Sequence, residues 1–326
     1  MISRRGFLAT ITVQLLAARV GEAQQKKKVY QIGYLGGSSR AAPLLDAFRK
    51  GLRDLGYIEE RNLLLTIRWG EASPERLRDF AAELVGLGVD VIVAGPDSSI
   101  AAAQQATKTI PIVMVLPTDP VRAGFITSLA RPGANVTGLT LEIGTELHGK
   151  RLEFLKQAFP MASLIAVLGN PAFAGRPSYS AAIAAAAHSL GVTIRFIDIR
   201  EPRELDAAFQ SLMRQRPEAL FVVSDPLVYS RRDQLLEVVS KLRLPAMYSA
   251  LDWAVAGGLM AYGPSRADLM RRAATYVDRI LKGAKPGDLP VEQPTKFELA
   301  VNVRTAKASA LAIPQSVLLR ADQMIE

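Results

Sequence analysis

Residues 29–69 decide the fold class, and they read VYQIGYLGGSSRAAPLLDAFRKGLRDLGYIEERNLLLTIRW. An apolar run at 29–35 is followed by an amphipathic pattern over 41–55 and by a second apolar run at 63–69. Short runs rich in Val, Ile and Leu are typical of parallel strands covered on both faces, and the pattern between them favours a helix. The stretch therefore predicts a strand–helix–strand unit of a parallel α/β sheet.

The same unit recurs along most of the chain. A first series adds predicted strands at 89–95 and 110–116, with helices at 74–87 and 98–108. A second series has predicted strands at 163–169, 192–199, 219–224 and 244–249, and helices at 147–159, 177–190, 203–215 and 231–242. Two such series predict two Rossmann-like lobes, each built on an open, doubly wound parallel sheet.

The chain is expected to pass between the lobes three times. A strand pattern at 136–141 separates the two series, and after the second series a strand pattern, a long helix pattern at 266–282 and a final strand pattern at 297–303 follow. The expected division is a first lobe of residues 24–139 plus 264–296, a second lobe of 140–263, and a hinge strand and tail at 297–326.

The first 23 residues have the three parts of an export signal. A basic start, SRRGFL at 3–8, precedes a mildly apolar stretch and small residues at Gly21 and Ala23. This order is typical of a cleaved signal peptide, and the apolar stretch is shorter than the roughly 20 residues that span a bilayer. The SRRGFL motif favours the twin-arginine route, with general secretion as the alternative. We expect cleavage after Ala23, a periplasmic product and no membrane insertion afterwards.

Composition excludes several kinds of site. The 326 residues include no cysteine and two histidines, so no disulfide, Cys-ligated metal, Cys nucleophile or lipid-modified cysteine is expected. We expect neither a metal nor a cofactor. The net charge of +9 raises nucleic acid as a partner, but the basic pairs are scattered without interleaved aromatics. An exported protein with such a pattern is expected to bind no nucleic acid.

Enzyme motifs are missing where a parallel sheet would carry them. No G-x-G-x-x-G follows the first predicted strand, and the chain has neither a G-x-x-x-x-G-K-[ST] loop nor a G-x-S-x-G elbow after a strand. His148 and His188 lie in helix patterns and are interpreted as surface or filler residues. The chain is therefore expected not to be an enzyme, although an exported α/β enzyme is the alternative from another class.

Candidate binding residues follow the predicted strands, because open α/β sheets bind ligands beyond the carboxyl ends of their strands. The candidates are Ser38, Asp97, Ser98, Ser99, Thr118 and Asp119 in the first lobe, and Asn170, Ser224, Asp225, Tyr229 and Trp253 in the second. Serines at a helix start can hold a carboxylate, aspartates can accept from an ammonium or hydroxyl group, and aromatics can form walls. The alternative is that Ser98 and Asp119 cap helices and that Trp253 belongs to the core.

Three longer motifs carry a family resemblance. Residues 128–139 read SLARPGANVTGL, residues 256–264 read AGGLMAYGP, and residues 288–299 read DLPVEQPTKFEL. The chain from 29 to 326 resembles the ABC transporter substrate-binding proteins of the TrpX-like group. That resemblance implies a type I periplasmic binding protein, with two α/β lobes, three hinge segments and a ligand cleft between the lobes.

The resemblance also implies a function and partners. It implies a receptor, expected to be monomeric, that delivers an aromatic amino acid or related carboxylate to a membrane permease with its ATPase. The carboxylate would lie at Ser98, Ser99 and Thr118. Asp225 would receive an amine or hydroxyl, and Tyr229 and Trp253 the body of the ligand. The alternative is a ligand sensor that presents its closed form to a membrane receptor kinase.

Two departures from the family pattern touch the expected cleft, so the ligand cannot be copied from relatives. Gly95-Pro96-Asp97-Ser98 stands where relatives often have G-G-T-P. Leu251-Asp252-Trp253 replaces the common R-E-[FY].

Overall fold

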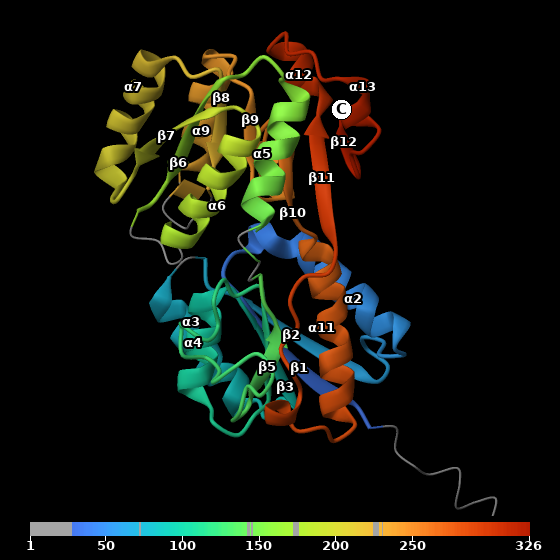
Figure 1. The fold of residues 1–326 in the computed structure, drawn as a ribbon. Coiled ribbons are helices and arrows are strands. Elements are labelled where there is room, and N and C mark those ends of the chain that lie inside the picture. Colours follow the sequence, from blue (N-terminus) through green and yellow to red (C-terminus); the bar gives the residue numbers. More distant parts are fainter. Residues whose placement is uncertain are drawn as a thin grey trace, which may run out of the picture.

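The computed structural model describes residues 28–71, 73–141, 144, 146–171, 176–223, 228–229 and 231–326. The expected signal peptide at 1–23 lies outside these described residues. The described chain forms two α/β lobes, one above the other in Figure 1, each with its own sheet. This arrangement confirms the predicted fold class of two doubly wound lobes.

The first lobe is built on a five-stranded parallel sheet in the order β2-β1-β3-β4-β5. Its strands are β1 (Tyr30–Gly36), β2 (Leu63–Trp69), β3 (Val91–Gly95), β4 (Ile112–Val115) and β5 (Val136–Leu139). The helical segments in this part of the chain are η2 (Ser39–Ala41), α2 (Ala42–Asp54), α3 (Pro74–Gly86) and α4 (Asp97–Ala106). Ser73 caps α3 by accepting a hydrogen bond from the Arg76 N–H at 3.3 Å, and Pro74 is the first helical residue, as expected at a helix start.

The second lobe is built on a seven-stranded sheet in the order β12-β11-β10-β9-β8-β6-β7. Its strands are β6 (Leu164–Gly169), β7 (Thr193–Asp198), β8 (Ala219–Val222), β9 (Ala246–Tyr248), β10 (Met260–Pro264), β11 (Phe297–Asn302) and β12 (Gln323–Ile325). Its helical segments are α5 (Glu146–Ala158), α6 (Arg176–Ser189), η3 (Pro202–Glu204), α7 (Leu205–Gln215), α9 (Arg232–Lys241), α10 (Leu251–Val255), α12 (Val303–Ala308) and α13 (Gln315–Leu318). The β10–β11 pair is antiparallel, whereas the other strand pairs of this sheet are parallel.

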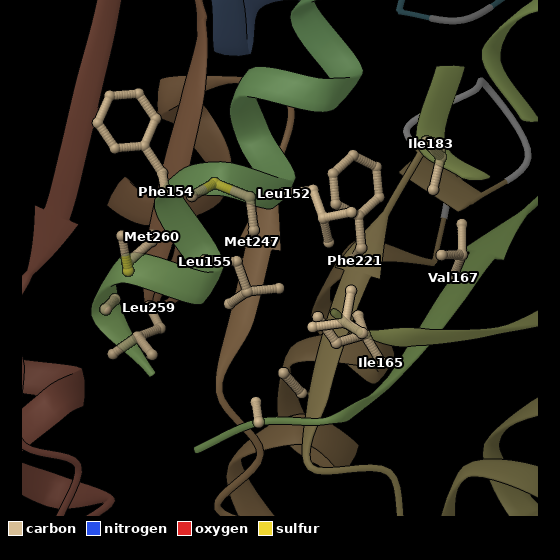
Figure 2. Close-up of a cluster of buried hydrophobic side chains, with 14 of the residues drawn as sticks. Leu152, Phe154, Leu155, Ile165, Val167, Ile183, Phe221, Met247, Leu259 and Met260 are labelled. Carbon is tan, nitrogen blue, oxygen red and sulfur yellow. The ribbon is translucent and has the colours of Figure 1, made fainter. Parts of the chain in front are cut away.

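The central strands β3, β4, β6 and β8 are covered on both faces, which explains why their sequences are apolar, whereas the edge strands β7 and β12 are partly exposed. In the second lobe, Leu152 and Leu155 of α5 pack against Phe221 of β8 and Met247 of β9 (Figure 2). A second cluster on that sheet contains Trp253 and Tyr248. The two clusters of the first lobe lie on either side of β1 and β3.

Helix α11 (Arg266–Leu281) lies between β10 and β11 of the second lobe in sequence but packs against α2 of the first lobe. The two helices approach closely at Gly51, where a Cβ would lie 2.4 Å from the Arg271 carbonyl oxygen. An extended segment with the short turn η4 (Pro286–Asp288) then leads to β11, which is in the second sheet. The structure thus places 266–281 with the first lobe, as the sequence suggests, while the precise domain limits stay a prediction.

The segments that pass between the lobes are hydrogen-bonded to one another. The Thr140 N–H donates to the Glu292 carbonyl at 3.0 Å, and the Glu292 N–H donates to the Gly138 carbonyl at 3.1 Å. The Ser265 N–H donates to the Lys296 carbonyl at 2.9 Å. Gly138 has φ +139°, and a Cβ there would lie 2.0 Å from the Met114 carbonyl oxygen. The passages therefore form one connected hinge region.

The tail differs most from the expectation. The sequence pattern predicts one short helix after the last strand, whereas the structure has α12, α13 and the edge strand β12. It also contains α10, which was not predicted. These elements are three to six residues long, too short for a periodic pattern to identify them.

Candidate functional site

The carboxyl ends of both parallel sheets face the region where the chain passes between the lobes. β5 ends where the chain leaves the first lobe, and β10 ends where it leaves the second (Figure 1). β1, β3 and β4 run parallel to β5, and β6, β8 and β9 run parallel to β10, so the strands of each set end on the same side. The loops that follow β1, β3 and β4 therefore face those that follow β6, β8 and β9, which is where open α/β sheets bind ligands.

Glu71 engages the loop after β1 in the first lobe. The Ser39 N–H donates to Glu71 Oε1 at 2.9 Å, and Ser38 Oγ donates to Oε2 at 3.2 Å. These bonds lower the pKa of the Glu71 carboxyl. Glu71 was not among the predicted residues, and it reaches Ser38 from the end of β2.

The start of α4 carries the predicted carboxylate site. Ser98 is exposed, whereas Ser99 is completely buried and its Oγ has no hydrogen-bond partner among the described residues. Because buried hydroxyls in native proteins are almost always paired, this orphaned group marks a place where a further polar group would be stabilising. The site is compatible with a bound ligand oxygen.

Two aspartates and Thr118 surround the same helix start. The Thr118 N–H donates to Asp97 Oδ1 at 3.3 Å, and Asp119 Oδ1 accepts from the Arg122 N–H at 2.9 Å. Burial raises the pKa of the half-buried Asp97 carboxyl, and the charge of Asp119 adds to that effect, against the Thr118 hydrogen bond. The contact of Asp119 closes the turn at 120–124, where the structure has no helix for it to cap.

In the second lobe, Asn170 follows β6 and its carbonyl accepts from the Tyr179 hydroxyl at 3.3 Å. The predicted residues Ser224 and Asp225 lie outside the described residues. Tyr229 is 40% exposed and Trp253 is fully buried. Trp253 stacks on Tyr248 at 4.9 Å and meets the Tyr229 ring edge-on at 5.8 Å. Trp253 thus belongs to the core, which is the alternative that the sequence left open, and its ring packs against the Tyr229 ring.

A charged cluster beside Tyr229 was not predicted from the sequence as a site. The Tyr229 hydroxyl donates to Asp252 Oδ2 at 2.5 Å, and Arg266 Nη1 lies 3.4 Å from the same oxygen. Arg232 Nη1 lies 4.0 Å from it and 3.3 Å from the Tyr229 hydroxyl oxygen. The available signal was the Leu251-Asp252-Trp253 departure from the family pattern.

Arg151 of α5 is buried and forms hydrogen bonds to the backbone of β10 and of the residue that follows β9. Its guanidinium donates to the Tyr262 carbonyl at 2.6 Å and to the Ser249 carbonyl at 3.2 Å. Burial lowers the pKa of Arg151 to about 10, which leaves it charged at neutral pH. Burial also lowers the pKa of the neighbouring His148 to about 3, with the Arg151 charge adding to the effect. His148 is thus a neutral packing residue against Tyr179.

The described residues contain no group of three or more His, Asp and Glu side chains placed to hold a metal ion. In the same part of the chain, no helix combines the length and apolarity needed to cross a membrane. The described residues at the facing strand ends can bind a ligand through hydrogen bonds, charge and aromatic contacts.

Comparisons with known proteins agree with this geometry. Residues 37–325 match the model of the family described as ABC transporter substrate binding protein. A protein named tyrosine-binding protein, from Clostridioides difficile strain R20291, is 28% identical over 270 residues, which cover 82% of this chain and 77% of that protein.

Solved structures match over nearly the whole described chain. A conserved domain protein from Vibrio cholerae has a TM-score of 0.75 at 28% identity and covers 91% of this chain and 100% of its own. A protein from Streptococcus pneumonia in complex with L-Trp has a TM-score of 0.76 at 24% identity, with 91% and 100% covered. At that identity the second match speaks for the fold alone.

Proposed function

The chain belongs to the family of ABC transporter substrate-binding proteins, and from this premise we propose that it is the periplasmic receptor of an importer. It captures a small organic solute between its lobes and delivers it to a permease driven by a cytoplasmic ATPase. The family match over residues 37–325 carries this proposal. No feature of the described residues favours the sensor alternative over transport.

The proposed ligand is an aromatic amino acid or a related carboxylate. The name of the tyrosine-binding relative supports this class, as does the L-Trp complex of a protein with the same fold. In this chain, the half-exposed Tyr229 ring and the polar strand ends supply both kinds of contact that such a solute needs. Ligand pockets commonly combine apolar walls with a few placed polar groups.

The proposed contacts come from both lobes. Ser98, Ser99 and Thr118 hold the carboxylate, while Asp225 accepts from the amine or a hydroxyl. The orphaned Ser99 hydroxyl at the start of α4 supports the first assignment, since helix starts present free N–H groups to anions. The other predicted neighbours of the ligand are Ser38, Asp97, Asp119, Asn170, Ser224 and Tyr229.

A ligand that contacts both lobes can shift the equilibrium between the open and closed forms of the protein. A ligand that touches both lobes in a closed form binds that form more tightly and so shifts the population toward it. The hydrogen-bonded passages through Gly138, Thr140 and Glu292 form the connected region about which such a hinge motion would occur. We expect the closed monomer to be the form that docks on the permease.

A thermal-shift screen of aromatic acids, amino acids and sugars tests the function. A ligand should raise Tm through linkage, by an amount that grows with its concentration. Ser99→Ala and Asp225→Ala should weaken binding of the hit, whereas Ser189→Ala at the end of α6 and Asp288→Ala in η4, which lies beside the residues that precede β5, should leave it unchanged. Unchanged affinity in the first two variants would refute the assigned contacts, and turnover of the hit would refute a receptor without catalysis.

Export is tested separately from binding. We propose that residues 1–23 direct the chain to the periplasm, by the twin-arginine route in preference to general secretion, without a lipid anchor. Replacing Arg4 and Arg5 by Lys should trap the full-length chain in the cytoplasm if the twin-arginine route is used. Normal export of this variant would favour general secretion.

A further inference from the structure

The cluster of Arg232, Arg266, Asp252 and Tyr229 has two positive groups that share one carboxylate. Both guanidinium groups approach the same oxygen, Asp252 Oδ2, at 4.0 and 3.4 Å. Arg232 also lies 3.3 Å from Asp233, but that carboxylate is 78% exposed and therefore strongly screened by solvent. Asp252 is 29% exposed, and its Oδ1 is buried without a hydrogen-bond partner among the described residues.

The two arginines occupy unfavourable positions in their helices. Arg232 is the first residue of α9, and Arg266 is the first residue of α11. Basic residues at a helix start oppose the positive end of the helix dipole and ordinarily cost stability there. Departures from a local rule are expected at functional or strained sites, and here two helices depart from the same rule beside one carboxylate. Each helix start also adds partial positive charge to the cluster.

The cluster joins residues of both lobes beside Tyr229, which is proposed to contact the ligand. Arg232, Asp252 and Tyr229 belong to the second lobe, whereas Arg266 begins the helix that packs against α2 of the first lobe. The Tyr229 ring is 40% exposed, and the Arg232 guanidinium lies over it at 5.4 Å from the ring centre. A ligand whose body lies against Tyr229 would therefore reach both arginines.

We propose that Arg232 and Arg266 select ligands that carry an additional anionic group at the end lying against Tyr229, distinct from the carboxylate held by α4. Asp252 neutralises only one of the two guanidinium charges, and a ligand carboxylate placed between the two guanidiniums would neutralise the other. Arginine offers five N–H donors in a planar fork, of which Arg266 uses one on a described side chain, so donors remain for a carboxylate. This inference rests on the proposed function and names the ligand's side-chain chemistry.

The test measures the affinity of L-phenylalanine and 4-carboxy-L-phenylalanine by isothermal titration calorimetry. The two probes share the amino-acid group and the ring, and they differ in one carboxylate. The wild-type protein should bind the carboxylated probe at least about tenfold more tightly, as expected for a charge-assisted hydrogen bond. Arg232→Met and Arg266→Met should each reduce this preference to about twofold or less.

Matched variants control for loss of charge alone. Arg231 precedes Arg232 and hydrogen-bonds Gln234, and Arg271 of α11 pairs with Asp54, so neither contacts Asp252. Arg231→Met and Arg271→Met should keep the full preference. Asp252→Asn should increase it, because the resident negative charge is removed. Thermal melts without ligand establish that each variant is folded.

The possible failures are distinguishable. If the wild-type protein binds phenylalanine as tightly as the carboxylated probe, or if Arg232→Met and Arg266→Met keep the preference, this inference is wrong and the receptor function stands. If neither probe nor any other aromatic amino acid binds, the proposed ligand class is wrong and the inference falls with it.

Discussion

The Gly138→Ala substitution is expected to destabilise the first lobe strongly. Gly138 lies in the edge strand β5, where its φ of +139° is one that L side chains rarely adopt. An added Cβ would lie 2.0 Å from the Met114 carbonyl oxygen and 2.8 Å from the Met114 nitrogen. Both neighbours are backbone atoms of β4, so no side-chain rotation can make room.

The magnitude follows from two separate costs. Holding a residue other than glycine in a sparsely populated backbone region costs about 1–3 kcal/mol. Forcing an extra methyl group into a packed region costs about 1–3 kcal/mol. Together they predict a loss of about 2–6 kcal/mol, a large share of the 5–15 kcal/mol that stabilises a typical protein.

The matched control is Gly86→Ala, the same chemical change at the end of α3. An added Cβ at Gly86 would have no atom within 4 Å, and Gly86 has no positive φ, so alanine should be neutral or stabilise by about 0.5–1 kcal/mol. Differential scanning calorimetry compares both with the wild-type protein. At about 2–4 °C per kcal/mol, Gly138→Ala should lower Tm by at least about 4 °C. A Tm within 1 °C of wild type (about 0.5 kcal/mol or less), or an equal loss in Gly86→Ala, would refute the reasoning.

Three further outcomes are expected. Burial holds the pKa of His148 at about 3, below its ordinary value of 6.5, so its neutral form stabilises the fold above pH 6.5 and this contribution is lost as pH falls toward 3. The free energy of unfolding of His148→Phe, measured in urea, should therefore fall less over that pH range than that of the wild-type protein. Parallel pH profiles would contradict the assignment. Asn302→Ala leaves the Thr305 N–H without its cap and removes one of two hydrogen bonds to the Ala254 carbonyl, which also accepts from the Gly257 N–H, so it should cost about 1–3 kcal/mol in chemical denaturation. Ser73→Ala removes the α3 cap and should cost about 1 kcal/mol; no change in Tm would show that the cap is dispensable.

The repeated units were predictable because the central strands are buried on both faces and helices such as α2, α7 and α11 are strongly amphipathic. The strand 63–69 was predicted with its observed limits, and Ser73-Pro74 marked the start of α3 correctly. Burial and capping act over a few neighbouring residues, so they leave a local pattern in the sequence. The strand predicted at 110–116 was too long at both ends, because the apolar residues there extend beyond the paired strand.

The site was less predictable because it depends on contacts between distant residues. The rule for strand ends predicts Tyr229 and the start of α4 as candidates, but it cannot indicate the cluster of Asp252 and Arg266, which meet only after the chain has folded. Arg232 was interpreted as part of a surface basic pair, since nothing nearby in sequence shows that it faces Asp252. Trp253 illustrates the reverse problem, because a residue in a loop at a strand end can still be completely buried.

The packing of α11 against α2 has a consequence for how the protein is made. The first lobe cannot complete its core when β5 leaves the ribosome, because Leu269, Ala273 and Val277 of α11 are still to come. Synthesis runs at about 5–20 residues per second, so the face that α11 covers stays exposed for roughly 7–28 s. During that time it is open to chaperones and to aggregation. A chain truncated after β10 lacks α11 and also β11 and β12 of the second sheet, so both lobes should stay incomplete and the chain should be degraded.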